Sequence, residues 1–397
     1  MQSYWIWLAE RKATAQQKRM LLERFCHAEA VYNAAEETLS RLPDMTQQLL
    51  QTLLDKDLDP ARQILNKCRR MHISVLTFTD ESYPPLLRNL HDAPVALYYQ
   101  GILPQWQSMP VIGIVGTRKA TPYGRDMAGA MSAQIAACGG LVVSGGALGI
   151  DTVALESAME TGNPVVAVLA GGLDRPYPAA NIPLFRRIAM NGCVFSEYPP
   201  GTPSMSWMFP ARNRIISGMS QGLLVVEAPA RSGALISAHH ALEQGRDVFS
   251  VPGNVSSETC AGSNALLQEG ARAVMSGWDV MREYAAQFPD RVSRRQMAPK
   301  RTESVLAVAQ KQIIPSAPDK KSIDKQEKST YSGVHTVKTA LSAQEQALVT
   351  AVGPEGGLTD DVIARSGLNA AEATKLLTRL ALKKVLVLHP GGRVTVA

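Results

Sequence analysis

Apolar and polar positions divide the chain into a helical start, a long alternation of strands and helices, and a compact tail. Before residue 70, apolar residues recur at helical spacing in segments 15–25, 48–54 and 60–68, which predicts a small helical region. The short apolar runs 74–78 and 95–99 follow, and we expect them to be edge strands of a sheet.

Six further apolar runs predict buried strands, and a helical pattern follows most of them. The strands are expected at 111–115, 141–143, 165–169, 194–195, 223–226 and 248–251, and the helices at 121–138, 151–160, 179–190, 234–244 and 264–268. Strands spaced by 20 to 30 residues with helices between them predict an α/β fold with a doubly wound parallel sheet. The segment between 196 and 222 is expected to be irregular.

Periodicity disappears between residues 286 and 340, where Lys, Ser, Gln and Pro predominate, and this composition predicts a flexible basic linker. Residues 341–397 then predict three helices and a small hairpin, the pattern of a winged helix. The helices start at Ser342, Thr359 and Asn369, each a residue type that caps helices. The predicted domains are therefore 1–70, 71–285, 286–340 and 341–397.

The third helix of the tail carries basic residues that suit duplex DNA, which winged helices often bind through this helix. These residues are Lys375, Arg379, Lys383 and Lys384. A protein-binding role for the tail remains an equal alternative.

Composition agrees with a globular protein, because 45% of the 397 residues are hydrophobic. The chain has no apolar run of about 18 residues and no signal-peptide pattern, so neither a membrane span nor secretion is predicted. The five cysteines are far apart and form no C-x-x-C, which argues against a zinc site and against a disulfide framework. We therefore expect no metal and a cytoplasmic location.

The net charge of +6 lies entirely in the predicted linker, which holds eleven basic and five acidic residues. Any DNA-binding surface on the folded parts must therefore arise from local clustering of basic side chains, not from overall charge.

Three small-residue turns, two of them directly after predicted strands, carry the candidate chemistry. They are Gly116-Thr117-Arg118, Ser144-Gly145-Gly146 and Arg231-Ser232-Gly233. Glycine lets backbone N–H groups approach a ligand closely, and the N-terminus of a following helix favours an anion. Three such turns on one alternating stretch predict a phosphate-binding edge of an open sheet.

A fourth cluster, Phe209 with Arg212, Asn213 and Arg214, offers two guanidinium groups for phosphate and an aromatic ring for a base. The alternative is an internal ion pair, such as one between an arginine and Glu227. Asp151, at the start of a predicted helix, is interpreted as a helix-capping carboxylate and not as a catalytic group.

Several enzyme motifs are missing from the sequence. G-x-x-x-x-G-K-[ST] and H-E-x-x-H do not occur, and no G-x-G-x-x-G follows Val115. We therefore predict no cofactor, and nucleic-acid phosphate becomes the leading ligand.

The order and spacing of these motifs between about residues 70 and 280 resemble the DprA/Smf family of DNA-processing proteins. Besides the turns above, the resemblance includes Gly149-Ile150-Asp151, Gly172-Leu173-Asp174, Tyr177-Pro178, Ser196-Glu197-Tyr198-Pro199, Gly245-Arg246-Asp247 and Val251-Pro252-Gly253. The tail is similar to the winged helix that many members carry, and the N-terminal helices are similar to the family's SAM-like domain.

The resemblance implies a Rossmann-like domain that binds single-stranded DNA as a homodimer without enzymatic turnover. Members protect incoming strands and load the RecA recombinase during natural transformation. The implied DNA-binding residues are those of the three turns and of the Phe209 cluster. The sequence departs from the family at Leu148, Leu155, Ala170, Ala179 and Ala180, where members often carry other residues. The basic residues lost among them imply a less basic rim.

Two other functions are weighed against this one. A nucleotide-binding or nucleotide-hydrolysing Rossmann-like enzyme would carry P-G-G-x-G-T-x-x-E, but the chain's P-G-G is Pro390-Gly391-Gly392, in the tail. A winged-helix-led duplex-DNA or scaffold protein would lose all DNA binding when residues 341–397 are deleted.

Overall fold

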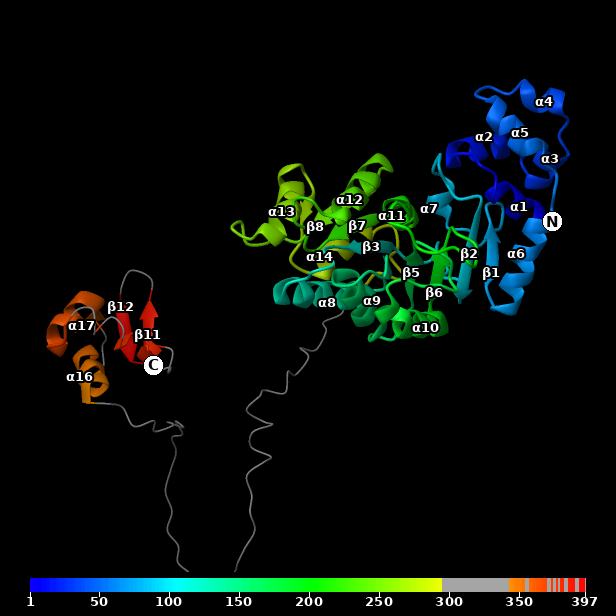
Figure 1. Cartoon of the computed structure of the whole chain (residues 1–397). Helices are drawn as coiled ribbons and strands as arrows, with labels where there is room; N and C mark the ends of the chain where they lie inside the picture. Colours follow the sequence, from blue (N-terminus) through cyan, green and yellow to red (C-terminus); the bar gives the residue numbers. More distant parts are fainter. Residues whose placement is uncertain are drawn as a thin grey trace, which may run out of the picture. The chain divides into compact units, whose positions relative to one another are not determined.

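A computed structural model describes residues 1–294, 343–353 and 357–369, together with 373, 376–377, 379–381, 385–389 and 393–396. The chain forms two compact units, Met1–Thr302 and Glu303–Ala397, which are described separately (Figure 1). Most of the predicted linker, residues 295–340, lies outside the described part. No helix of the described residues is both long and apolar enough to span a bilayer.

The larger unit is built on one nine-stranded sheet. Its strands are β1 (Ser74–Thr77), β2 (Ala96–Gly101), β3 (Val111–Val115), β4 (Leu141–Ser144), β5 (Val165–Leu169), β6 (Cys193–Ser196), β7 (Gly222–Val225), β8 (Asp247–Ser250) and β9 (Arg272–Ala273). The order is β1-β2-β6-β5-β4-β3-β7-β8-β9, and every pair from β6 to β9 is parallel. The predicted doubly wound parallel sheet is confirmed, and β1 and β2 form its antiparallel edge.

Helices cover both faces of this sheet, because the central strands are apolar on both sides. Successive residues of β3 alternate between two cores: Ile112 and Ile114 join one, Val111 and Val115 the other. Figure 1 shows α8 (Pro122–Ala137), α9 (Ile150–Met159), α10 (Ile182–Asn191) and α14 (Gly277–Met281) on one side, and α7 (Pro85–Arg88), α11 (Met208–Met219), α12 (Gly233–Glu243) and α13 (Ala261–Gln268) on the other. Single 3-10 turns span Ala179–Asn181, Glu258–Cys260 and Arg282–Tyr284.

The segment 196–222 was expected to be irregular, and this prediction is wrong because it contains α11. In the sequence, Pro210 and the polar residues that follow it interrupt the apolar periodicity by which a helix is predicted. Proline is tolerated in the first turn of a helix, and Ile215, Ile216 and Met219 bury the inner face of α11.

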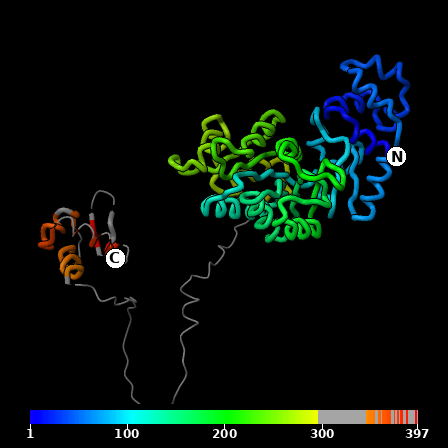
Figure 2. Tube along the Cα trace, in the orientation of Figure 1, coloured from blue at the N-terminus to red at the C-terminus, as the bar shows by residue number. Residues whose placement is uncertain are grey.

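Six helices form the N-terminal part, which lies at the β1 end of the sheet (Figure 2). They are α1 (Gln2–Ala9), α2 (Ala15–Phe25), α3 (Ala28–Asn33), α4 (Glu36–Ser40), α5 (Gln47–Leu54) and α6 (Asp59–Arg70). The three predicted helices correspond to α2, α5 and α6. Helix α1 escaped prediction because Trp5, Ile6, Trp7 and Leu8 are all buried, so no polar face marks its period.

The packed chain continues past the predicted boundary at residue 285. Val292 belongs to the hydrophobic core, and Arg291 Nε donates to the Gly139 carbonyl oxygen at 3.3 Å.

The smaller unit has the elements of a winged helix. It contains α16 (Ala343–Val352), β10 (Gly357–Leu358), α17 (Thr359–Ser366), β11 (Leu386–His389) and β12 (Arg393–Val396), with the sheet order β10-β12-β11. Gly367 ends α17 in the left-handed conformation, at φ +67°. Ala373, Leu377 and Leu380, in the third predicted helix, are buried in this unit's core. Arg379 is exposed, whereas Lys375, Lys383 and Lys384 lie outside the described residues.

Candidate nucleic-acid interface

The sheet has a topological switch point between β3 and β7. From β3 the chain adds β4, β5 and β6 on one side and then β7, β8 and β9 on the other. Loops that leave the carboxyl ends of strands on either side of such a point diverge, and open α/β sheets bind ligands in the resulting crevice. A hollow of about 760 Å³, here called the groove, lies at this position.

Nine of the thirteen predicted site residues line the groove. They are Gly116, Thr117, Arg118, Phe209, Arg212, Asn213, Arg231, Ser232 and Gly233. They come from the loop after β3, from α11 and from the loop before α12, which are far apart in sequence.

The turn after β3 is held tightly on both sides. Thr117 N–H donates to the Glu227 carbonyl oxygen at 2.7 Å, and Ile150 N–H donates to the Thr117 carbonyl oxygen at 3.2 Å. A Cβ at Gly116 would lie 2.5 Å from Ile150 Cγ1 and 2.9 Å from the Glu227 carbonyl oxygen, so this position requires glycine. The turn therefore presents Arg118 from a fixed backbone.

Three exposed basic side chains, Arg118, Lys119 and Arg231, form the rim of the groove. Within the part of the chain that the structure describes, none of them makes an ion pair or a side-chain hydrogen bond. Their charges are therefore available to an anionic ligand.

An aromatic wall stands beside Arg118. The Arg118 guanidinium lies 4.9 Å from the centre of the Phe209 ring, and the edge of Tyr177 meets Phe209 at 5.6 Å between ring centres. Tyr177 is 52% exposed. Such a wall offers a cation and two rings on which an unpaired base can stack.

The N-terminus of α12 opens into the groove on the other side. Ser232 caps this helix, and its Oγ accepts from Ala234 N–H at 3.2 Å. Ser237, one turn further, is buried and lines the groove, yet its hydroxyl has no hydrogen-bond partner among the described residues. A helix N-terminus next to Arg231 suits an anion such as a phosphate.

Arg212 lines the groove, but its guanidinium donates hydrogen bonds to backbone carbonyl groups of the protein itself. Its Nη1 donates to the Gly145 carbonyl oxygen at 2.6 Å and to the Val168 carbonyl oxygen. Only 4% of the residue is exposed, and it joins the carboxyl ends of β4 and β5. Burial lowers the pKa of Arg212 to about 10, which leaves it protonated at neutral pH. Arg212 thus supports the groove, and among the described residues no arginine pairs with Glu227, which was the example given for the ion-pair alternative.

Asp151 lies in the same buried layer and also borders the groove. Burial raises the pKa of this carboxyl, while the nearby Arg212 guanidinium and the N–H groups of Ala147 and Gly145 act in the opposite direction. Its interpretation as an N-cap is corrected: Gly149 is the N-cap of α9, and Asp151 Oδ2 accepts from Ala147 N–H at 3.3 Å in the first turn.

Arg214 is corrected from a groove residue to a member of an internal ion pair. Its Nη2 lies 2.7 Å from both Glu197 carboxylate oxygens, and its Nη1 donates to the Asp92 carbonyl oxygen at 2.9 Å. Burial disfavours its charged form, but Glu197 and Asp92 outweigh that effect and raise its pKa. The ion-pair alternative therefore holds for Arg214, with Glu197 as the partner.

The second turn, Ser144-Gly145-Gly146, also lies outside the groove. All three residues are buried. Ser144 Oγ donates to the Ile114 carbonyl oxygen at 2.6 Å, and Asn181 Nδ2 donates to the Gly146 carbonyl oxygen at 2.9 Å. This turn supports the groove from behind and does not expose an N–H nest to it.

Sequence reasoning missed several groove residues. Besides Asp151, they include Lys119, Tyr177, Ser204, Ser206 and Ser237. Lys119 could have been found as the basic neighbour of Arg118, and the two serines lie in the segment expected to be irregular. Nothing in the local pattern marks Ser237, which is one more small residue of a helix.

The described residues contain no cluster of three or more His, Cys, Asp or Glu side chains that could hold a metal ion. Four of the five cysteines are buried, Cys26 is exposed, and all five are unpaired.

Comparisons with known proteins agree with the two units. The family model described as DNA recombination-mediator protein A matches residues 74–285, and the model of the DprA winged helix domain matches residues 336–392. DNA processing protein DprA of Bacillus subtilis (strain 168) is 37% identical over 221 residues, which cover 56% of this chain and 74% of that protein.

DNA processing protein DprA of Streptococcus pneumoniae (strain ATCC BAA-255 / R6) is 42% identical over 209 residues, covering 52% of this chain and 72% of that protein. The X-ray structure of DNA processing protein A from Streptococcus pneumoniae superposes with a TM-score of 0.64 at 32% identity. The superposition covers 71% of this chain and 98% of that chain.

Proposed function

The chain belongs to the DNA recombination-mediator protein A (DprA/Smf) family, and from this premise we propose that it binds single-stranded DNA in the groove without catalysis. The observation that carries the proposal is the rim of Arg118, Lys119 and Arg231, three exposed cations that make no ion pair or side-chain hydrogen bond among the described residues, beside the rings of Phe209 and Tyr177.

A single strand suits this groove better than a duplex does. The bases of a duplex are stacked inside it, whereas a single strand exposes base faces that aromatic side chains can bind. Phe209 and Tyr177 provide such faces, and the basic rim follows the sugar–phosphate backbone. Phosphate binding at the N-terminus of α12 would bring Arg231 into contact with the same group.

We extend the proposal to the family's role as a mediator: the chain protects single strands in the cytoplasm and loads the RecA recombinase on them, as a homodimer. The outermost strand β9 supports dimerisation, since it pairs only with β8 among the described strands, and Met275 beside it is 78% exposed. Light scattering tests the dimer, and the rate of RecA filament assembly on an oligonucleotide, with and without the protein, tests loading.

The DNA-binding proposal is tested by titrating labelled single-stranded and duplex oligonucleotides at several salt concentrations. We expect tighter binding of the single strand and a salt dependence of about 0.7 in the slope of log K against log[salt] per phosphate contacted. Arg118→Ala and Arg231→Ala should each weaken binding and each reduce the slope by about that amount.

Arg24→Ala is the matched control, because Arg24 is also an exposed, unpaired arginine of the described chain but lies outside the groove. Equal binding by the parent and both groove variants would refute the proposal. Incubation with nucleoside monophosphates tests the absence of catalysis, and release of free base would contradict it.

A further inference from the structure

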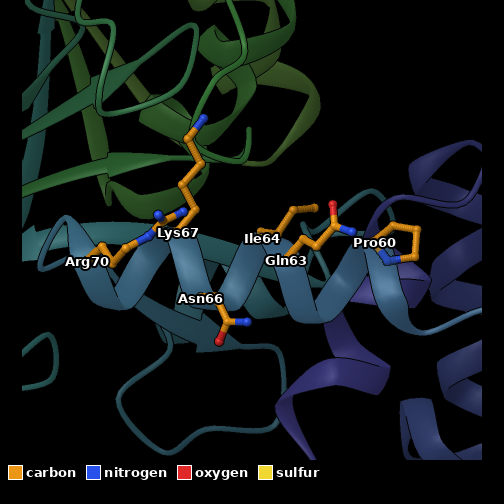
Figure 3. Close-up of a pocket in the computed structure, with 6 residues that line it drawn as sticks. All are labelled: Pro60, Gln63, Ile64, Asn66, Lys67 and Arg70. Carbon is orange, nitrogen blue, oxygen red and sulfur yellow. The ribbon is translucent and has the colours of Figure 1, made fainter.

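A second hollow lies on helix α6 of the N-terminal part, outside the groove. It measures about 710 Å³ and is lined by Pro60, Gln63, Ile64, Asn66, Lys67 and Arg70 (Figure 3). Arg70 is exposed and has no hydrogen bond or ion pair among the described residues. The function proposed above makes no use of this hollow.

One loop, residues 198–207, joins the two hollows. Ser204 and Ser206 of this loop line the groove. Near the loop's other end, Gly201 contacts Lys67 so closely that a Cβ at Gly201 would lie 2.4 Å from Lys67 Nζ. Figure 3 shows Lys67 reaching from α6 toward the loops of the sheet domain. The loop therefore lines the groove near one end and contacts a residue of the α6 hollow near the other.

The loop exposes large apolar side chains along that path. Trp207 is 57% exposed and Met205 is 51% exposed, and both are neighbours of the groove serines. The rings of Trp207 and Tyr198 meet edge to face at 6.1 Å between ring centres. The indole therefore packs against Tyr198 while the rest of its surface stays exposed. Trp207 and Met205 together expose apolar surface on this loop, and a ligand that covers the indole face removes that surface from water.

The position of Lys67 is fixed by an acidic residue of the sheet domain. Asp174 Oδ2 lies 3.7 Å from Lys67 Nζ, and Asp174 Oδ1 accepts from Gly201 N–H at 2.6 Å. One carboxylate therefore ties the lysine to the loop and neutralises part of its charge. Arg70 has no such partner within the described part of the chain, and it supplies the uncompensated charge of the α6 hollow.

Basic residues in the last turn of α6 also offset the helix dipole, which is the simplest account of their presence. That account explains their sign but not the junction with the loop, nor the exposed indole beside the groove. Alternating aromatic and basic groups on one path are the arrangement that single-stranded nucleic acid binds.

We propose that the bound single strand continues from the groove over Trp207 to the α6 hollow, where Lys67 and Arg70 contact its phosphates. This inference rests on the proposed function and extends the DNA path to the N-terminal helices. A short strand fills only the groove, whereas a longer one reaches α6.

The experiment compares oligothymidylates of about 4 and about 16 nucleotides, the two ends of common single-strand site sizes. Two variants of the full-length chain are compared with the parent: the double variant Lys67→Gln with Arg70→Gln, and the single variant Trp207→Ala. The matched control is Arg24→Gln with Arg41→Gln, which removes the same charge from exposed positions of the same helical part, outside both hollows.

The Lys67–Arg70 variant should bind the long strand more weakly, with a salt slope smaller by about 1.4, and bind the short strand like the parent. Trp207→Ala should weaken the long strand by roughly 5- to 140-fold, the equivalent of one stacked base, and Trp207→Phe should restore most of it. The long strand should also quench more tryptophan emission in the parent than in Trp207→Phe.

Unchanged binding of the long strand by both variants overturns the inference and leaves the groove intact. So does a loss no larger than that of the control. Binding of the short strand shows whether each variant is folded. If the Lys67–Arg70 variant does not fold, the comparison of tryptophan quenching between the parent and Trp207→Phe still tests the inference. If the parent binds neither strand, the proposed function fails, and this outcome is distinct from the others.

Discussion

Replacing Arg212 by methionine is expected to destabilise the protein, whereas replacing Arg118 by alanine is expected to weaken DNA binding without loss of stability. Both arginines line the groove, but their surroundings differ. Arg212 is buried and bonded to two backbone carbonyl groups, while Arg118 is exposed and its guanidinium lies over the Phe209 ring.

The magnitude follows from what each change leaves behind. Arg212→Met leaves the Gly145 and Val168 carbonyl groups without their donor and removes a cation that stabilises the charged form of the buried Asp151 carboxylate. Breaking a buried charged contact of this kind costs about 3–5 kcal/mol. At about 2 °C per kcal/mol, the value for large domains, the Tm should fall by roughly 6–10 °C. Arg118→Ala should change stability by less than about 0.5 kcal/mol.

Thermal unfolding followed by circular dichroism, together with oligonucleotide titration below the transition, measures both quantities in the same samples. Adding Asp151→Asn to Arg212→Met should recover part of the lost stability, because the stranded carboxylate is then neutral. The reasoning is refuted if Arg212→Met unfolds at the parental temperature while it loses DNA binding as Arg118→Ala does.

Three further predictions follow from the same contacts. Acidification from neutral pH should tighten oligonucleotide binding as Asp151, whose pKa burial raises above 3.8, takes up a proton beneath the groove. Asp151→Asn should abolish this pH dependence. In the parent, the free energy of unfolding should fall as pH rises from 3.8 to the raised pKa, because in that range the unfolded chain has released the Asp151 proton and the folded chain still holds it. Asp151→Asn should abolish this loss of stability as well. Arg214→Met should cost about 3–5 kcal/mol by stranding Glu197, yet the folded fraction should bind oligonucleotide with parental affinity; weaker binding would place Arg214 in the DNA path after all. Truncation after residue 302, where the first compact unit ends, should leave single-strand binding in place, and complete loss would move the DNA site to the winged helix.

The strand and helix pattern was largely predictable, because a strand that is buried on both faces of the sheet consists of a short apolar run. β3 and β5 match their predicted ranges, and the turns after β3 and before α12 do line the groove. The failures have local causes as well. The helix α1 has no polar face, and Pro210 with its polar neighbours conceals α11.

The roles of the arginines were not predictable from local sequence. The partners of Arg214 come from elsewhere: Glu197 precedes it by 17 residues and Asp92 by 122. The Ser144-Gly145-Gly146 turn resembles a phosphate-binding turn by composition, but in the fold its glycines pack against Arg212 and Phe185.

The sequence by itself determined the α/β alternation, the winged-helix tail and the small-residue turns at the carboxyl ends of strands, since each depends on the periodicity or chemistry of neighbouring residues. Only the tertiary structure decided which arginines are free to meet a ligand. Arg118 and Arg231 stay exposed at the switch point between β3 and β7, whereas folding brings carbonyl and carboxylate groups from distant segments onto Arg212 and Arg214. A guanidinium that burial separates from water must find such partners, and no local pattern records which one it will find.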